Sequence, residues 1–417
     1  MYSTKIRTVN RIINPHAGIF RCMSVLKKAG LYPYLDHLLG SRVKQAKYSF
    51  SNILMSWAIS NMCNGKRLED INQIRHVFTE QGLLMPSPDT LSRFFRKFAT
   101  PTEKFDSGKG KHKHEFNVNP KLNSMLIKMA KKLGLLKSKE NILDFDGTVI
   151  ECKKYDSTVS YKQEYGYSPA CAVINEVPVY IQQRSGHTPA SFKIGEAIID
   201  CLYTLENHGV HVSAVRSDAA AYSINSLESL DASGYKFYVR AMTSDRLLHE
   251  APPVHMWKKV LINGIEEAVY SVNLKMYDGK IAFRYVLQQC LEYEIRKKKS
   301  GLTHPLRIIC TNDFHSSNEA VIHTYNQRGK SEQNFHVLKK DFGWARLPHS
   351  TMNENLSFMY FSSIAYLIFQ FLRMRFSKKS MITEANRLKK FIVHIVEVSG
   401  YLENDELILC AGGKSPP

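Results

Sequence analysis

Four side chains in the segment 325–339 have the types and the spacing needed to act together on a phosphate. Tyr325, Arg328, Glu332 and Lys339 are separated by 3, 4 and 7 residues, so an α-helix would bring all four to one side. A carboxylate there can hold a divalent cation, Arg can grip a phosphate through two hydrogen bonds, and Lys supplies a point charge. A surface helix with an Arg–Glu pair four residues apart looks the same locally, so the pattern needs support from other residues.

Three aspartates at predicted strands supply that support. Asp144 and Asp146 alternate within the predicted strand 141–150, so both carboxylates point to one face. Asp218 ends a second predicted strand, and open α/β sheets bind ligands at such strand ends. Together with Glu332, these carboxylates could hold two Mg²⁺ or Mn²⁺ ions, which clamp the attacking and leaving oxygens of an in-line phosphoryl transfer. Any one of the aspartates alone could be a turn or capping residue.

The segments around these residues alternate between strand and helix patterns, which predicts an α/β fold. Helical apolar spacing dominates residues 1–100, and the polar stretch 101–120, rich in Gly, Lys and His, is predicted to be a linker. Several extended stretches then interrupt the alternation and predict a β-rich insertion. The chain is therefore divided into four parts. These are a helical N-terminal region at residues 1–115, a first core part at 116–234, the insertion at 235–310, and a second core part with C-terminal helices at 311–405.

The charge of the chain indicates a polyanionic partner. Its formal net charge is +19 and its pI is about 9.4, and a basic surface attracts phosphates. Residues 1–115 hold 19 Lys and Arg against 8 Asp and Glu, which is +11 of the total. Within them, Arg93, Arg96 and Lys97 lie on a predicted helix that follows a proline-rich turn, an arrangement suited to DNA contact in a helix-turn-helix manner. An ordinary solvated basic helix explains this local pattern equally well.

Cysteines and apolar segments exclude several other classes of protein. The eight cysteines are scattered without a C-x-x-C pair, so reduced thiols are expected instead of a disulfide framework or a zinc site. The N-terminus lacks an apolar signal core. Leu356–Leu372 is uncharged, but it contains several polar residues and stands alone, so it is predicted to be a buried core helix and not a membrane span. A cytoplasmic protein is expected.

The segment that contains Asp144 and Asp146 also resembles a motif of phosphatases. The segment Asp144–Val149, DFDGTV, resembles the D-x-D-G-T nucleophile motif of haloacid-dehalogenase-type phosphatases, in which Asp144 would be the phosphoryl acceptor and Asp146 the acid/base. Such enzymes need a paired-aspartate motif after a later strand, whereas Asp218 is followed by three alanines and Tyr222. A small-metabolite phosphatase would also leave the basic N-terminal region unexplained.

The spacing Y-x2-R-x3-E-x6-K in the segment 325–339 resembles the signature around the catalytic Glu of the DDE transposases of bacterial insertion sequences, in the cut-and-paste group. Four fixed residues over fifteen positions make this resemblance fairly specific. Other segments resemble the same family, and together they cover most of residues 15–375. They are Asn64–Ile71, Pro86–Leu91, Leu143–Thr148, Gly166–Pro169, Arg184–Thr188, Arg216–Ala219 and Asn353–Leu356.

The resemblance implies an RNase H-like catalytic core, interrupted by the β-rich insertion and preceded by a helical DNA-binding domain. Its members are Mg²⁺-dependent enzymes that bind the terminal inverted repeats of a transposon, cleave the DNA and join the ends to target DNA, usually as homodimers on double-stranded DNA. A cytoplasmic, nucleoid-associated bacterial protein without a membrane contact is implied. A domesticated copy that binds DNA without cutting it stays open as an alternative.

The resemblance also implies a role for each acidic residue. Asp146, Asp218 and Glu332 would form the catalytic, metal-binding triad, with Asp146 shared between the two ions. One ion would activate water or a 3′-OH, and the other would stabilise the leaving 3′ oxygen. Whether Asp144 assists metal binding stays open.

Contacts with DNA follow from the same resemblance. Arg328 and Lys339 would hold the scissile phosphate region, and Tyr325 would position the strand. In some relatives the insertion supplies a Trp that stacks on a flipped base, for which Trp257 is the candidate here, with a packed surface Trp as the alternative. Trp344 is interpreted as structural or as a contact with flanking DNA.

Overall fold

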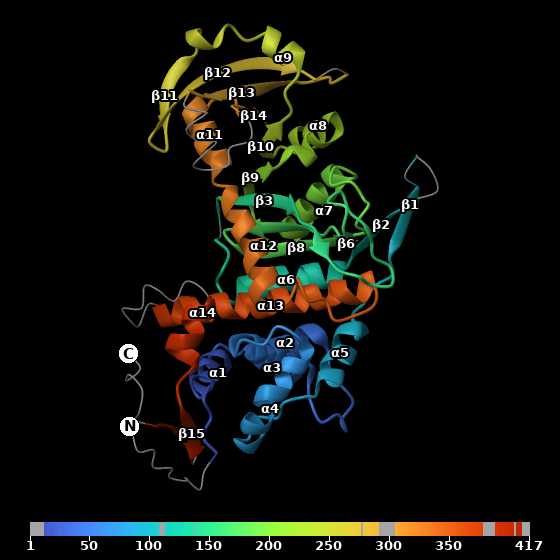
Figure 1. Ribbon diagram of the computed structural model, residues 1–417, viewed down its shortest axis with the longest axis vertical. Helices are drawn as coiled ribbons and strands as arrows, with labels where there is room; N and C mark the ends of the chain where they lie inside the picture. The colour runs from blue at the N-terminus through green and yellow to red at the C-terminus, as the bar shows by residue number, and fades with distance from the viewer. Residues whose placement is uncertain are drawn as a thin grey trace, which may run out of the picture.

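The computed structural model shows a mixed α/β protein, as predicted, in which a long sheet and a layer of N-terminal helices lie on opposite sides of one long helix (Figure 1). The structure describes residues 12–106, 108, 113–137, 139–276, 278–291, 305–377, 388–403 and 406–410, without the side chains of residues 330–332.

Eleven strands of the described chain form one sheet in the order β1-β2-β8-β7-β3-β9-β10-β14-β13-β12-β11. In this order, their bounds are Glu103–Asp106, Lys113–Val118, Val177–Arg184, Ala170–Ile174, Asn141–Gly147, Val212–Ser217, Lys236–Ala241, Leu306–Thr311, Ala282–Cys290, Ile265–Lys275 and Lys258–Ile262.

The centre of the sheet combines parallel and antiparallel pairs. β3 runs parallel to β9, and β9 runs parallel to β10, while β3 pairs antiparallel with β7 and β7 with β8. Parallel neighbours need a crossover, which helix α7 (Ile194–Asn207) provides before β9 and helix α8 (Ile224–Ala232) provides before β10. β3 is buried on both faces because Leu143 and Phe145 point into the core on one side and the two aspartates point to the other. The carboxyl ends of β3 and β9 therefore meet at the same edge of the sheet.

The β-rich region extends this sheet instead of forming a separate one. β10, β14, β13, β12 and β11 pair antiparallel in succession, and Figure 1 shows them at the top of the molecule. The extended stretches predicted between residues 235 and 310 are confirmed as strands. Because β10 also pairs in parallel with β9, it connects the two halves of the sheet. The domain boundaries themselves stay predictions.

Helix α13 (Met352–Ser377) joins the sheet to the N-terminal helices. It packs against α3 (Phe50–Met62), α5 (Pro88–Lys97), α6 (Pro120–Lys132) and β8, and the ring of Trp57 lies 5.5 Å from that of Phe358. By length and composition it could cross a membrane, but its most apolar window is completely buried inside the fold. The prediction of a buried core helix is confirmed.

The remaining described elements are short or lie at the periphery. They are α1 (Gly18–Lys28), α2 (Leu31–Leu39), η1 (Leu68–Asp70), α4 (Ile71–Glu80), β4 (Ile150–Glu151), β5 (Thr158–Val159), β6 (Tyr165–Tyr167), η2 (Ala219–Ala221), α9 (Asp245–His249), η3 (Val254–Met256), α11 (Asn318–Asn326), α12 (Gly329–Asp341), α14 (Leu388–Phe391), η4 (Ile392–Val396), β15 (Gly400–Glu403) and β16 (Glu406–Leu409).

The predicted linker at residues 101–120 is wrong where the structure describes it. Its two ends form strands β1 and β2, which pair antiparallel, and β2 continues the main sheet through β8. Phe105 and Phe116 pack edge to face with their ring centroids 5.5 Å apart, and Lys104 pairs with Glu115 at 2.9 Å. Such cross-strand pairs stabilise a hairpin even in a polar, glycine-rich segment.

Candidate active site

The two aspartates predicted to act together are brought together at the edge of the sheet. Asp146 lies near the end of β3 and is 8% exposed, and Asp218 follows β9 directly. The Oδ1 atom of Asp146 accepts the backbone N–H of Gly147 at 2.9 Å, and Oδ1 of Asp218 accepts that of Ala220 at 3.0 Å. Burial raises the pKa of Asp146 to about 6, and the nearby negative charge of Asp218 acts in the same direction. This is a pair of hard oxygen donors that favours a bound cation.

Arg328 is the cation that this pair now faces. Its Nη1 atom donates to Oδ2 of Asp146 at 2.7 Å, and the guanidinium lies 5.9 Å from the ring centre of Tyr325. Burial lowers the pKa of Arg328, but Tyr325 and the two carboxylates of Asp146 and Asp218 outweigh it, so the pKa is raised. Tyr325 and Arg328 therefore lie beside the acidic pair, whereas their predicted contacts with DNA stay predictions.

Lys339 connects the other end of α12 to the chain that follows β3. Its Nζ atom donates to Oγ1 of Thr148 at 2.6 Å and to the carbonyl oxygen of Val149 at 2.7 Å. Burial lowers the pKa of this ammonium group. Arg328 and Lys339 thus contact the segment 146–149 from two positions eleven residues apart, so helix α12 is fastened beside the end of β3.

The backbone around Glu332 differs from the single helix expected over residues 325–339. Helix α11 ends at Asn326 and α12 begins at Gly329, and the N–H of Arg328 bonds to Tyr325 three residues back, as in a tighter turn. Glu332 lies in the first part of α12, about one helical turn after Arg328. Its side chain lies outside the described part of the structure, so its predicted metal contact stays a prediction.

Asp144 is committed to a different partner. Both of its oxygens accept hydrogen bonds from the guanidinium of Arg216, at 2.6 and 2.7 Å, and the pair is buried between β3 and β9. Arg216 also donates to the carbonyl oxygen of Thr324 at 2.8 Å, which ties the sheet to α11. Asp144 is therefore a structural group that positions α11, and the geometry gives no support to a phosphatase with Asp144 as nucleophile.

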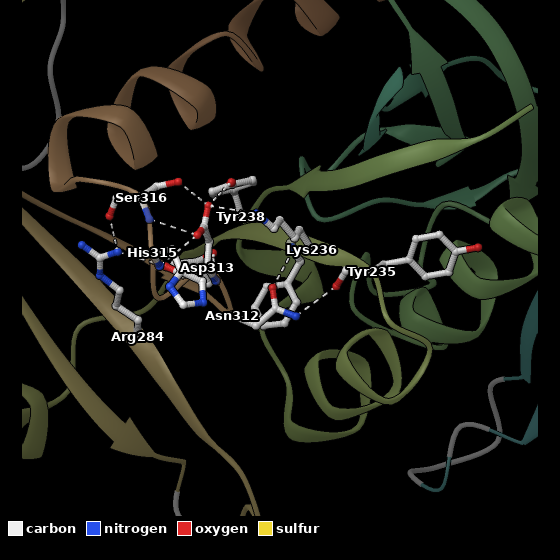
Figure 2. A network of polar contacts seen from close by, with 10 residues as sticks. Tyr235, Lys236, Tyr238, Arg284, Asn312, Asp313, His315 and Ser316 are labelled. Carbon is white, nitrogen blue, oxygen red and sulfur yellow. Dashed lines mark hydrogen bonds and ion pairs between the residues drawn. The ribbon is translucent and has the colours of Figure 1, made fainter. Parts of the chain in front are cut away.

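A buried polar network at the start of α11 was missed by the sequence analysis (Figure 2). The carboxylate of Asp313 accepts hydrogen bonds from the hydroxyls of Tyr238 (2.8 Å) and Ser316 (2.6 Å) and from the backbone N–H groups of His315 and Ser316. Arg284 donates to the backbone oxygens of Asp313 and Ser316 and to Asn318. The available signal was an Asp followed by serines three and four residues later, which is a typical turn pattern. The network fixes the beginning of α11, the helix that carries Tyr325 near its end.

The pKa of Asp313 gives this network a testable pH dependence. Burial raises this pKa, but the hydrogen bonds from Ser316 and Tyr238 outweigh it, so the pKa lies well below its usual range. A depressed carboxyl pKa contributes stability that is present above the unfolded pKa of about 4 and is lost as the pH falls below it. We expect Asp313→Asn to lower the free energy of unfolding by about 2–3 kcal/mol at pH 7. Urea denaturation measures the difference in the free energy of unfolding between Asp313→Asn and the wild type, and this difference should become smaller from pH 5 to pH 3. The exposed Asp245→Asn should not differ from the wild type. A difference that grows on acidification would contradict the expected pH dependence.

The basic residues of α5 form a surface separate from the acidic pair. Ser87 caps the helix, and Leu91, Phe94 and Phe95 are buried on its inner side, whereas Arg93, Arg96 and Lys97 are exposed. Arg96 pairs with Glu354 of α13 at 3.6 Å. Helix α13 lies between this surface and the sheet, so a DNA contact by α5 would be distinct from the one at Asp146 (Figure 1).

Both tryptophans singled out in the sequence are buried. Trp257 is 6% exposed, stacks on Tyr270 and donates its indole N–H to the carbonyl oxygen of Pro252 at 2.7 Å. Base stacking by Trp257 would require the ring to leave this site, so its predicted DNA contact gains no support. Trp344 is fully buried and donates to the carbonyl oxygen of Met359, as expected for a structural residue.

The donor set at the sheet edge fits a divalent metal in its chemistry but is incomplete in the described residues. Asp146 and Asp218 offer carboxylate oxygens, which Mg²⁺ and Mn²⁺ prefer. Among the side chains that the structure describes, no group of three or more His, Cys, Asp or Glu lies close enough to hold a metal ion. A third protein ligand would therefore be a side chain that the structure does not describe, and Glu332 is one of these.

Comparison with known proteins identifies one family. The family model described as "Transposase DDE domain group 1" matches residues 10–405 of the chain. The search of curated proteins found no match to the chain. The matched range covers nearly the whole chain, including both aspartates and all of helix α12.

Proposed function

The chain belongs to the DDE transposase family, and we propose that it binds the terminal inverted repeats of an insertion sequence, cleaves the DNA there and joins the freed ends to target DNA. The observation that carries this proposal is the convergence of Asp146 and Asp218 at the ends of two adjacent parallel strands, next to Arg328. Phosphoryl transfer is favoured over other chemistries because two carboxylates and a guanidinium provide sites for a metal ion and a phosphate at one place.

The strand order supports an RNase H-like catalytic core. The strands β8-β7-β3-β9-β10 form a five-stranded unit in which only β7 runs against its neighbours, with helices in the crossovers from β8 to β9 and from β9 to β10. The strands β11 to β14 come between Asp218 and Glu332 in the sequence, which supports an insertion domain at this point. The insertion would share the sheet of the core and would begin after β10.

Asp146, Asp218 and Glu332 would hold two Mg²⁺ or Mn²⁺ ions. Such ions activate the attacking oxygen and neutralise charge on the leaving oxygen of an in-line transfer. The chain's own residues supply position and charge: Lys339 fixes the segment after β3, and the Arg216–Asp144 pair fixes α11 relative to β9. Tyr325 would position the DNA strand beside Arg328, whose charge is suited to the scissile phosphate.

A direct test uses the purified full chain with a duplex that carries the inverted repeats flanking its gene. With Mg²⁺, we expect cleavage at the repeat boundary and, with a supercoiled plasmid as target, joined products. A duplex with a scrambled repeat of the same length is the control. Uncut repeat DNA, together with hydrolysis of p-nitrophenyl phosphate that Asp144→Asn abolishes, would overturn the proposal in favour of the phosphatase.

The N-terminal helices would recognise the repeats, with the protein acting as a homodimer on DNA. The net charge of +11 in residues 1–115 supports this role, and α5 exposes three of these charges side by side. Binding of this kind depends steeply on salt because each contacted phosphate releases counterions.

We expect the triple change of Arg93, Arg96 and Lys97 to Gln to weaken binding of repeat DNA and to reduce the slope of log K against log salt by about 2 to 3. Fluorescence anisotropy between 50 and 300 mM KCl measures this slope. Lys389→Gln, an exposed lysine on α14, is the control for a general loss of charge. An unchanged slope in the triple variant would remove α5 from the DNA interface.

A further inference from the structure

Arg328 occupies the oxygen of Asp146 that a metal ion would need. The Oδ1 atom of Asp146 already accepts the N–H of Gly147, and Oδ2 pairs with Nη1 of Arg328 at 2.7 Å. The ion pair is largely buried, with side-chain exposures of 15% for Arg328 and 10% for Asp146. A guanidinium and a divalent cation repel each other at such short range in a partly buried site, so Arg328 competes with a metal ion for this oxygen.

We propose that Arg328 is a built-in counter-cation of the catalytic carboxylates, which is exchanged for the metal ion when DNA binds. Before DNA binds, Arg328 neutralises Asp146 and keeps the site from taking up metal tightly. When a DNA phosphate arrives, Arg328 turns to it and releases Oδ2 of Asp146 for the ion. This inference rests on the proposed function, because it concerns the same carboxylates and the same substrate.

The backbone around Arg328 is suited to such a movement. Arg328 lies between α11 and α12, outside both helices, and is followed by Gly329. Among the described atoms outside its chain neighbours and its own helix backbone, none lies within 4 Å of the position of a Cβ added to Gly329. The neighbouring ring of Tyr325 offers a second contact to the guanidinium at 5.9 Å. Movements are commonly absorbed at the ends of helices, so a side chain at this junction can change its partner without disturbing the sheet.

The exchange makes metal binding and DNA binding cooperative. A phosphate that takes Arg328 away from Asp146 raises the affinity for the metal, and by linkage a bound metal raises the affinity for DNA. As a consequence, unspecific cleavage is limited, because a nuclease site that binds metal weakly in the absence of its DNA cuts few other phosphodiester bonds.

Binding of Mn²⁺ to the full-length protein without DNA tests the exchange, with free Mn²⁺ measured by electron paramagnetic resonance. We expect Arg328→Gln to bind Mn²⁺ about tenfold more tightly than the wild type, because the competing cation is gone. Arg328→Lys keeps the charge and should stay near the wild type. Lys340→Gln is the matched control, since it removes one positive charge from an exposed position on the same helix, and it should change the affinity by less than about twofold.

Two outcomes overturn the exchange, and they are distinguishable from a failure of the proposed function. If Arg328→Gln binds Mn²⁺ no better than the wild type, while Asp146→Asn abolishes binding, the exchange is wrong and the metal site stands. If neither the wild type nor Arg328→Gln binds Mn²⁺, both are wrong. Thermal unfolding checks that the variants are folded: Mn²⁺ should raise the melting temperature of Arg328→Gln by more than that of the wild type.

Discussion

Asp146→Asn should abolish cleavage of transposon-end DNA, with a loss of about 10³-fold or more, while repeat binding is retained. The amide keeps the shape of the side chain and its acceptor for the N–H of Gly147, but it removes the charge that a metal ion needs. Loss of several kcal/mol of charge stabilisation in the transition state corresponds to a rate effect of this size. Gel-based cleavage with Mg²⁺ measures the rate, and electrophoretic mobility shift measures binding.

The retained binding of repeat DNA is the more specific part of this prediction. Neutralising Asp146 weakens its ion pair with Arg328 and leaves more of the positive charge of Arg328 to attract a DNA phosphate, so binding of the repeat duplex should be equal to that of the wild type or tighter. Asp245→Asn makes the same chemical change at an exposed position on α9 and should leave both measurements unchanged. Cleavage by Asp146→Asn at the wild-type rate would rule out Asp146 as a metal ligand.

Asp146 and Asp218 could be predicted as candidate site residues from the sequence because short, local patterns place each of them on or after a strand. Alternation along a strand places Asp146 relative to Asp144, and a position just after a strand places Asp218 at the sheet edge. Only the parallel pairing of β3 and β9, which depends on the crossover helix between β8 and β9, brings the two aspartates together. The α/β alternation predicts an α/β fold without saying which strands are neighbours, and the pairing of Phe145 with Ser217 is what sets the two aspartates side by side.

Partners distant in sequence could not be predicted in the same way. Asp144 and Asp146 are two residues apart and look equivalent in the sequence, yet one pairs with Arg216 inside the sheet and the other with Arg328 from a helix junction. The difference arises because Arg216 lies directly opposite Asp144 on β9, whereas Arg328 reaches Asp146 from the junction of α11 and α12, and no local pattern encodes either contact. The strands that carry Phe105 and Phe116 were missed for a related reason: they are held by cross-strand pairs and by the pairing of β2 with β8, while their composition is typical of a loop.

Glu332→Gln tests whether the catalytic site is completed from α12. Asp146 and Asp218 supply two carboxylates, and no third metal-binding residue joins them among the described side chains. Glu332 lies about one turn after Arg328 on the helix that Arg328 and Lys339 fasten beside β3, so its backbone is on the element next to the pair. We expect Glu332→Gln to reduce cleavage about 10³-fold, like Asp146→Asn, and Glu332→Asp to keep part of the activity because it keeps the carboxylate.

Glu319→Gln makes the same change on α11, at a residue whose carboxylate pairs with Lys258, and should cut DNA at the wild-type rate. Mn²⁺ binding separates a metal ligand from a structural residue: Glu332→Gln should weaken it about tenfold or more, whereas a residue that only stabilises the helix would lower the melting temperature and leave the affinity of the folded protein unchanged. Wild-type cleavage by Glu332→Gln would mean that the third carboxylate comes from another part of the chain. The signature in residues 325–339 would then have a role in DNA contact alone, carried by Arg328 and Lys339.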